Sequence, residues 1–140
     1  MSADFKFSAS SRRNLAGVHP DLVLLVSRAL LYSAGDFKVV EGVRSLDRQK
    51  ELYEAGKSKT LKSKHITGHA IDVMAVGDLN RDGIVDHKDR GITWNREWYS
   101  EINDAFIIAS GELGIGFTWG GEWTRSFPPN GDCPHFQLET

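Results

Sequence analysis

Hydrophobic residues recur along this chain with periods of 3.6 and 2, a pattern that predicts helices alternating with short strands. A helix is predicted to begin at Pro20, because the fixed φ of proline suits a first helical turn. A longer helix is predicted from about Arg96 to Leu113, where Gly114 ends it. The predicted buried faces are Leu22, Leu25, Val26, Ala29 and Leu30 in the first helix, and Trp98, Ile102, Ala105, Phe106, Ala109 and Leu113 in the second.

The segment between these two helices is predicted to hold a strand and a third helix. Phe37 to Val43 is rich in β-forming residues and is predicted to be a strand. Ser45 is expected to cap a helix from Leu46 to Ala55, which Gly56 ends. On this helix, Gln49 is expected to face solvent.

A further strand is predicted from Ala70 to Val76, with Ala70 and Asp72 on one face and Ile71 and Val73 on the other. Separate helices and strands joined by long loops favour an α+β fold with a small, mainly antiparallel sheet and about three helices. The remaining predicted segments are short strands at Phe117 to Trp119 and Phe136 to Leu138, and polar loops at Lys57 to Lys64 and Gly77 to Gly91.

Composition places the chain among ordinary soluble proteins and predicts one domain, residues 1–140. The 140 residues are 40% hydrophobic and 26% charged, and the net charge of -2 gives no basis for nucleic-acid binding. Cys133 is the single cysteine, so no internal disulfide is expected. Met1 to Ser11 lacks the apolar core of a signal peptide, and Leu22 to Leu31 is too short to span a bilayer. We therefore expect synthesis in the cytoplasm and no stable membrane insertion.

One run of residues carries the strongest chemical signal. Ser63 to Asp72 follows the pattern S-x-H-x-x-G-x-A-x-D, and a further histidine, His135, follows Asp132 near the C-terminus. Two imidazoles and one carboxylate, from His65, His135 and Asp72, form a ligand set typical of catalytic zinc. Such a set leaves one position open for water, and a carboxylate outside the set, here Asp132, can accept a proton from that water.

Each of these residues has an ordinary interpretation when it is taken alone. His65 then belongs to a surface loop, and Asp72 is a carboxylate at a strand end. His69 is a competing ligand. It lies three residues before Asp72, however, so on a strand its side chain would point to the opposite face from that of Asp72. The set as a whole predicts a metal site, provided that the backbone bends at Gly68.

The chain resembles the zinc D,D-peptidase superfamily, and within it the L-alanyl-D-glutamate endopeptidases that tailed phages use as endolysins. The resemblance covers nearly the whole chain and implies a D-Ala-D-Ala peptidase/Hedgehog-like fold. Besides the run above, it rests on Phe37 to Ser45, on Trp119-Gly120-Gly121-Glu122-Trp123, and on Asp132-Cys133-Pro134-His135-Phe136.

The resemblance implies a role for each matching position. His65, Asp72 and His135 are expected to bind zinc, Asp132 to act as general base, and Arg44 to contact the substrate or the transition state. Arg44 alone would equally well be a solvated or salt-bridged cation. Ser63 is a weaker candidate, either a hydrogen-bond donor to the substrate or a loop residue. The expected site residues are therefore catalytic Asp132 and Arg44, substrate-binding Arg44 and Ser63, and metal-binding His65, Asp72 and His135.

A second metal motif follows the Asp72 strand. Residues 78–89 read D-x-N-x-D-G-x-V-D-x-x-D, which resembles the calcium loops of EF-hands and, with aspartate at position twelve, those of dockerins more closely. Val85 is expected to point inward as a hydrophobic anchor, and the alternative is a solvated polar loop. Calcium would be structural or regulatory, and its expected ligands are Asp78, Asn80, Asp82, Ile84 through its carbonyl, Asp86 and Asp89.

Together these features predict a zinc-dependent endopeptidase that cuts the L-Ala–D-Glu bond of the peptidoglycan stem peptide. The alternatives are a D-alanyl-D-alanine carboxypeptidase or dipeptidase, and a non-catalytic calcium-binding module that binds the cell wall. The expected partner is bacterial peptidoglycan, and the expected state is a monomer. Made in the host cytoplasm, the protein is expected to act in the periplasm or cell wall after release.

The tryptophans could stack on sugars of the cell wall. This role is open for Trp94, Trp119 and Trp123, whereas Trp98 is expected in the core.

Overall fold

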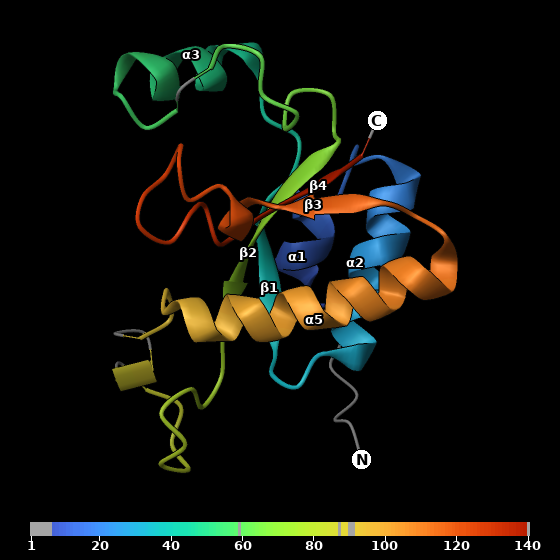
Figure 1. Ribbon diagram of the computed structural model, residues 1–140, viewed down its shortest axis with the longest axis vertical. Helices are drawn as coiled ribbons and strands as arrows, with labels where there is room; N and C mark the ends of the chain where they lie inside the picture. Colours follow the sequence, from blue (N-terminus) through green and yellow to red (C-terminus); the bar gives the residue numbers. More distant parts are fainter. Residues whose placement is uncertain (1–6, 59, 87, 90–91, 140) are drawn as a thin grey trace.

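A four-stranded antiparallel sheet forms the centre of the computed structural model, which describes residues 7–58, 60–86, 88–89 and 92–139. The strands are β1 (Phe37–Glu41), β2 (Ala70–Ala75), β3 (Phe117–Trp119) and β4 (His135–Leu138). They lie in the order β1-β2-β4-β3, so β2 pairs with a strand from the far end of the chain (Figure 1). The predicted α+β class with a small antiparallel sheet is confirmed.

Four helices accompany the sheet in the described part of the chain: α1 (Ala9–Asn14), α2 (Pro20–Tyr32), α3 (Leu46–Glu54) and α5 (Arg96–Leu113). The last three confirm the predicted helices, and Ser45 caps α3 by accepting a hydrogen bond from the Arg48 amide at 3.0 Å. Helix α1 was not predicted, because it is one short polar segment without a hydrophobic stripe. The side chain of Ser8 caps it.

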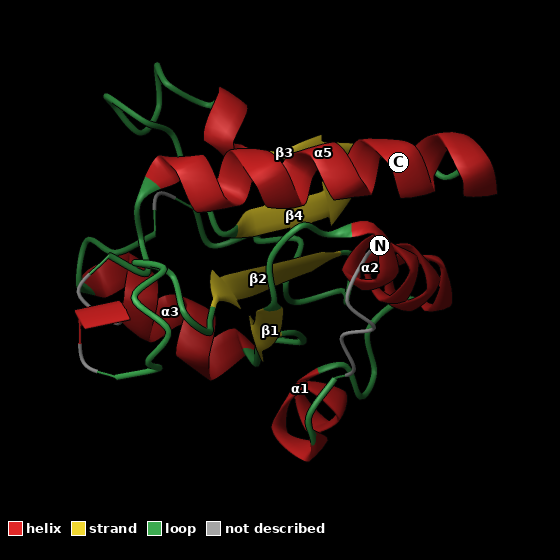
Figure 2. Cartoon of the chain, turned by 90° about the horizontal axis from the view of Figure 1, so that it is seen from below, coloured by secondary structure: helices red, strands yellow, loops and turns green. Residues whose placement is uncertain are grey.

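The hydrophobic core lies between α2, α5 and one face of the sheet (Figure 2). At its centre the rings of Phe106 and Phe136 stack with centroids 4.1 Å apart. All five predicted positions on α2 are buried. On α5 the prediction needs correction, because Tyr99 is buried whereas Trp98 and Leu113 are only half-buried.

Strand register decides which side chains lie on the sheet face away from this core. Ile71, Val73 and Phe136 pack into the core, so the alternating Asp72 and His135 lie on the other face, where they are direct partners across β2 and β4.

The pairing of β1 with β2 shifts by one residue between Val39 and Glu41, and the shift places Glu41 opposite Asp72. Without it, Glu41 would pair with a core-facing position. The sheet therefore presents Glu41, Asp72 and His135 on one face.

None of the described helices has both the length and the apolar character needed to cross a membrane. The first six residues lie outside the described part of the chain, so the structure does not bear on most of the segment Met1 to Ser11.

Candidate metal centre and cleft

Two of the expected ligands lie on adjacent strands and the third comes from the loop before β2. Nδ1 of His135 and Nε2 of His65 each lie 3.3 Å from Oδ1 of Asp72. The loop is tied to the end of β1, because the Arg44 amide donates to the His65 carbonyl at 2.9 Å. It then turns back into β2 at Gly68, whose φ of 78° is in the left-handed region, as the predicted bend requires.

His69 does not take part in this group. Its Nδ1 lies 2.8 Å from the hydroxyl of Thr67, and its ring lies 5.0 Å from that of His19. Among the described residues, only the side chains of His65, Asp72 and His135 bring three potential metal ligands together, with their donor atoms within 4.8 Å of one another.

The hydrogen bonds of the two imidazoles assign their protons. Nδ1 of His65 lies 3.0 Å from the carbonyl oxygen of Gly42, so Nδ1 donates and Nε2 carries a lone pair. Nε2 of His135 lies 2.9 Å from Oε1 of Gln137, so Nε2 donates and Nδ1 carries a lone pair. Both lone pairs therefore face the carboxylate oxygen of Asp72, and the arrangement contains three acceptors and no donor.

This arrangement fits a bound cation. Nε2 of His65 and Oδ1 of Asp72 are buried, and neither has a hydrogen-bond partner among the described residues. Tetrahedral ligands at about 2.0–2.1 Å from zinc are roughly 3.3–3.4 Å apart, which matches the two 3.3 Å separations. Burial raises the pKa of Asp72, but hydrogen bonds and positive charge from His135 and His65, when these rings are protonated, outweigh burial and hold that pKa well below its ordinary value. Asp72 is thus ionised at neutral pH, as a ligand must be.

Arg44 is buried beside this group and is held from three sides. Its Nε donates to Oε1 of Glu41 at 2.6 Å, and its Nη1 donates to Oε1 of Gln49 at 2.7 Å. Its Nη2 lies 3.8 Å from Oδ2 of Asp72. Arg44 is therefore a fixed cation at the metal site, neither a solvated residue nor a simple surface ion pair.

The expectation that Gln49 faces solvent was wrong. Gln49 is 1% exposed, and its amide nitrogen donates to the hydroxyl of Ser58 at 2.8 Å and to the carbonyl of Thr60 at 2.6 Å. It thus joins Arg44 to the loop at residues 58–60. Glu41 and Gln137 were also missed, although Gln137 could have been found because it alternates with His135 on the same strand face.

Replacing Gln49 by leucine is expected to lower the free energy of unfolding by about 1–3 kcal/mol, because it removes a hydrogen-bond acceptor from the buried guanidinium of Arg44. Urea denaturation followed by circular dichroism measures this loss. Its neighbour Lys50 is exposed on the same helix, so Lys50→Gln serves as the control and should stay within about 0.5 kcal/mol of the parent. Equal stabilities for the two variants would contradict the bridging role of Gln49.

Asp132 reaches the same site from a turn that glycines make possible. Its amide donates to the carbonyl of Gly120 at 2.8 Å, and its own carbonyl accepts from the His135 amide at 3.2 Å. Gly131 has a φ of 76°, and a Cβ there would lie 2.6 Å from the Gly120 carbonyl oxygen. Burial raises the pKa of Asp132, and the nearby charge of Asp72 raises it further. A carboxylate whose pKa is raised toward neutrality is suited to accept a proton.

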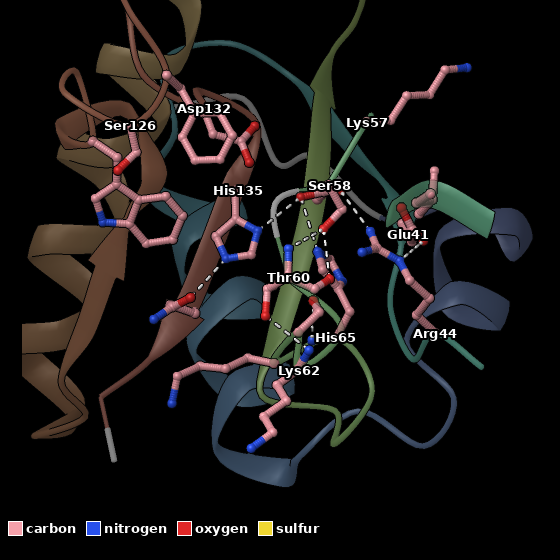
Figure 3. Close-up of a pocket in the computed structure, with 17 residues that line it drawn as sticks. Glu41, Arg44, Lys57, Ser58, Thr60, Lys62, His65, Ser126, Asp132 and His135 are labelled. Atoms are coloured by element: carbon pink, nitrogen blue, oxygen red, sulfur yellow. Dashed lines mark hydrogen bonds and ion pairs between the residues drawn. The ribbon is translucent and has the colours of Figure 1, made fainter. Parts of the chain in front are cut away.

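These residues line a cleft of about 570 Å³ (Figure 3). Its floor includes Asp72 and His135. One wall is formed by residues 57, 58, 60 and 62–64, and the other by residues 123, 126, 127 and 132. Ser63 lines the cleft, but its hydroxyl also accepts a hydrogen bond from the His65 amide at 3.2 Å and so supports the loop.

The four tryptophans have different environments. Trp123 lines the cleft, with its ring centroid 5.0 Å from that of His135. Trp119 is buried and donates to the Cys133 carbonyl at 2.7 Å, whereas Trp94 is 57% exposed and does not line this cleft. Only Trp123 is therefore placed to contact a ligand at the metal site.

The predicted calcium loop folds its carboxylates onto its own backbone. Asp78 accepts from the amides of Asp82 and Gly83 at 3.2 and 2.8 Å, and Asp89 accepts from those of Asn80 and Asp86 at 3.1 and 2.8 Å. Gly83 has a φ of 85°, as the expected sharp turn requires.

One expectation for this loop needs correction. Val85 is 71% exposed, so it is not an inward anchor, and Ile84 beside it is 59% exposed. An EF-hand loop lies between two helices that cover such an anchor, whereas this loop leaves strand β2. In addition, none of the described loop residues lines the metal-site cleft, so the loop does not form a wall of that site.

Comparisons with known proteins agree with this geometry. Residues 1–137 match the family model of the phage L-alanyl-D-glutamate peptidases. The L-alanyl-D-glutamate peptidase of Escherichia phage T5 is 36% identical over 125 residues, which cover 87% of this chain and 84% of that protein. The peptidoglycan L-alanyl-D-glutamate endopeptidase CwlK of Bacillus subtilis is 30% identical over 112 residues, 74% of this chain and 60% of CwlK.

A solved structure is similar along nearly the whole chain. The crystal structure of the Serratia marcescens L-Ala D-Glu endopeptidase ChiX matches with a TM-score of 0.78 and 44% identity, covering 97% of this chain and 91% of ChiX. Family match, relatives and fold therefore agree, and the chain belongs to the phage L-alanyl-D-glutamate peptidase family.

Proposed function

We propose that this protein is a zinc-dependent endopeptidase that hydrolyses the L-Ala–D-Glu bond of the peptidoglycan stem peptide. The observation that carries the proposal is the meeting of three acceptors, from His65, Asp72 and His135, beside the carboxylate of Asp132. Membership of the phage L-alanyl-D-glutamate peptidase family supports the L-Ala–D-Glu bond as the bond that is cut and peptidoglycan as the substrate. We further propose that residues 1–140 act as one catalytic domain and as a monomer, released from the host cytoplasm to the cell wall.

The residues around the cleft suit the chemistry of amide hydrolysis. His65, Asp72 and His135 would hold zinc, which would supply a Lewis acid for the scissile carbonyl and for the attacking water. Asp132 accepts the proton of the attacking water and passes it to the leaving amine of D-glutamate. Arg44, fixed by Glu41 and Gln49, provides positive charge for the oxygen that becomes negative in the transition state.

The masses of peptidoglycan digestion products test the scissile bond. The proposal predicts fragments with L-alanine at a new C-terminus and D-glutamate at a new N-terminus. Release of free D-alanine from peptidoglycan would instead support the D-alanyl-D-alanine carboxypeptidase alternative, and hydrolysis of added D-alanyl-D-alanine to free D-alanine would support the dipeptidase alternative. A non-catalytic wall-binding module would release no fragment at all, although it would sediment with the peptidoglycan.

We also propose that the loop at residues 78–89 binds calcium through Asp78, Asn80, Asp82, Asp86 and Asp89 and the carbonyl of Ile84. A crowded set of carboxylates favours a hard cation with oxygen ligands. Because the loop follows β2, which carries Asp72, bound calcium would influence the metal site through that strand. The expected role is therefore stabilisation, with any regulation of hydrolysis acting at a distance.

Calcium is expected to raise the midpoint of thermal unfolding, since a ligand at 100 times its Kd stabilises the folded state by about 2.7 kcal/mol. Differential scanning calorimetry with and without calcium measures the shift, and hydrolysis is followed in parallel with a chelator that spares zinc. Asp82→Ala should lose the shift, whereas Asp104→Ala, at an exposed position on α5, should keep it. No shift in the parent would contradict calcium binding, and a shift without a change in hydrolysis would exclude regulation.

A further inference from the structure

The two walls of the metal-site cleft differ in chemical character. The wall at residues 57, 58, 60 and 62–64, called the lysine wall below, contributes Lys57, Lys62 and Lys64 to the cleft, whereas the opposite wall contributes Trp123 and Phe127. Figure 3 shows Lys57 and Lys62 on the side of the cleft away from Ser126. The chain as a whole has a net charge of -2, so this basic wall is a local feature. A ligand that spans the cleft therefore meets positive charge on one side and apolar surface on the other.

The charges of two of these lysines are available to a ligand. Lys57 and Lys62 are exposed, and neither side chain forms an ion pair with any residue that the structure describes. Arg44, by contrast, already donates to Glu41 and Gln49 and lies near Asp72. Among the described residues that line the cleft, Lys57 and Lys62 thus carry positive charge that no ion pair neutralises.

The lysine wall is also anchored, because the loop is bonded within itself and to α3. Gln49 donates to Ser58 and to the Thr60 carbonyl, and the Lys62 amide donates to the hydroxyl of Thr60 at 2.9 Å. The same glutamine holds Arg44 at the metal site. The lysines are consequently carried on a segment whose backbone has a fixed relation to the reacting centre.

The proposed substrate presents a complementary charge next to the bond that is cut. In a stem peptide, D-glutamate continues the chain through its γ-carboxyl group, so its α-carboxylate stays free, one carbon from the scissile nitrogen. The side chains of Lys57 and Lys62 point in different directions (Figure 3), so they supply positive charge along the cleft and do not form a pair on one group. We infer that this charge attracts the α-carboxylate and that the cleft selects stem peptides with free D-glutamate over those carrying its α-amide, D-isoglutamine. The inference rests on the proposed function and names the feature of the leaving segment that the protein recognises.

Two synthetic stem peptides test the inference, one with D-glutamate and one with D-isoglutamine, otherwise identical. The zinc-loaded parent is expected to show a kcat/KM higher by roughly fivefold to tenfold for the D-glutamate peptide, the range that two exposed charges beside an anionic group supply. The double variant Lys57→Gln/Lys62→Gln is expected to lose most of that preference, mainly through a higher KM for the D-glutamate peptide.

The matched control removes two positive charges away from the cleft, as Arg13→Gln/Lys50→Gln, both at exposed positions. It should retain the full preference of the parent, which separates local binding from general attraction to an anionic substrate. Equal kcat/KM values of the parent for the two peptides, or equal preference in the lysine variant and the control, would overturn the inference. Failure of the parent to cut either peptide would instead contradict the proposed function.

Discussion

Replacing Asp132 by asparagine is expected to lower the rate of peptidoglycan hydrolysis by about 10²–10⁴-fold, the contribution typical of a positioned general base. Asparagine keeps the size of the side chain and removes its capacity to accept a proton. Asp132 is not one of the three converging ligands, so the variant should bind zinc as the parent does. Initial rates on purified peptidoglycan and the zinc content of the same protein samples measure the two properties together.

The control for this substitution is Asp104→Asn, the same chemical change at an exposed position on α5. It should leave both the rate and the zinc content unchanged. An Asp132→Asn variant that hydrolyses peptidoglycan at the parental rate would exclude Asp132 as the base. A variant that loses zinc would instead place Asp132 among the groups that hold the metal.

Replacing His65 by alanine is expected to lower zinc affinity by more than about 100-fold, since loss of an outer hydrogen-bond partner alone costs about 10–100-fold. Hydrolysis should fall to the level of metal-free protein. The substitution removes one of the three acceptors and leaves Asp72 and His135, which is too few ligands for a stable site. Competition with a chromogenic chelator measures the affinity without reference to activity.

His69→Ala provides a control within the same segment, because the side chain of His69 contacts Thr67 and His19 and lies outside the metal group. Zinc affinity should be the same in this variant as in the parent. Circular dichroism confirms that both variants are folded before zinc is titrated. Parental zinc affinity in His65→Ala would contradict the assignment of this ligand.

The sequence predicted that His65, Asp72 and His135 come together, because their residue types and spacing are as a set typical of a metal site. What brings them together is the pairing of β2 with β4, which places Asp72 opposite His135. That pairing joins distant parts of the chain, so the local pattern predicted both strands without predicting the register. The register shift in β1, which turns Glu41 toward the site, likewise has no local signal.

Gln49 could not be placed from the sequence for a different reason. Helix α3 is mostly polar, and Gln49 is its only buried residue, so no hydrophobic stripe indicates the inner face. Its burial depends on hydrogen bonds to Arg44 and to the loop at residues 58–60, which are tertiary contacts. The prediction for Val85 was wrong in the opposite sense, because Val85 was expected to be buried and is exposed. The calcium-loop motif suggested a covered anchor, which a loop that leaves a strand does not provide.

The most direct test of the central claim is metal restoration on a single synthetic stem peptide that contains the L-Ala–D-Glu bond. Protein stripped of metal is mixed with increasing zinc, and the products are identified by mass. We predict that cleavage is absent without zinc, reaches its maximum near one equivalent, and occurs only between L-alanine and D-glutamate. Cleavage by the metal-free protein, or at another bond after zinc is restored, would contradict the role of His65, Asp72 and His135 as the ligands of a catalytic zinc.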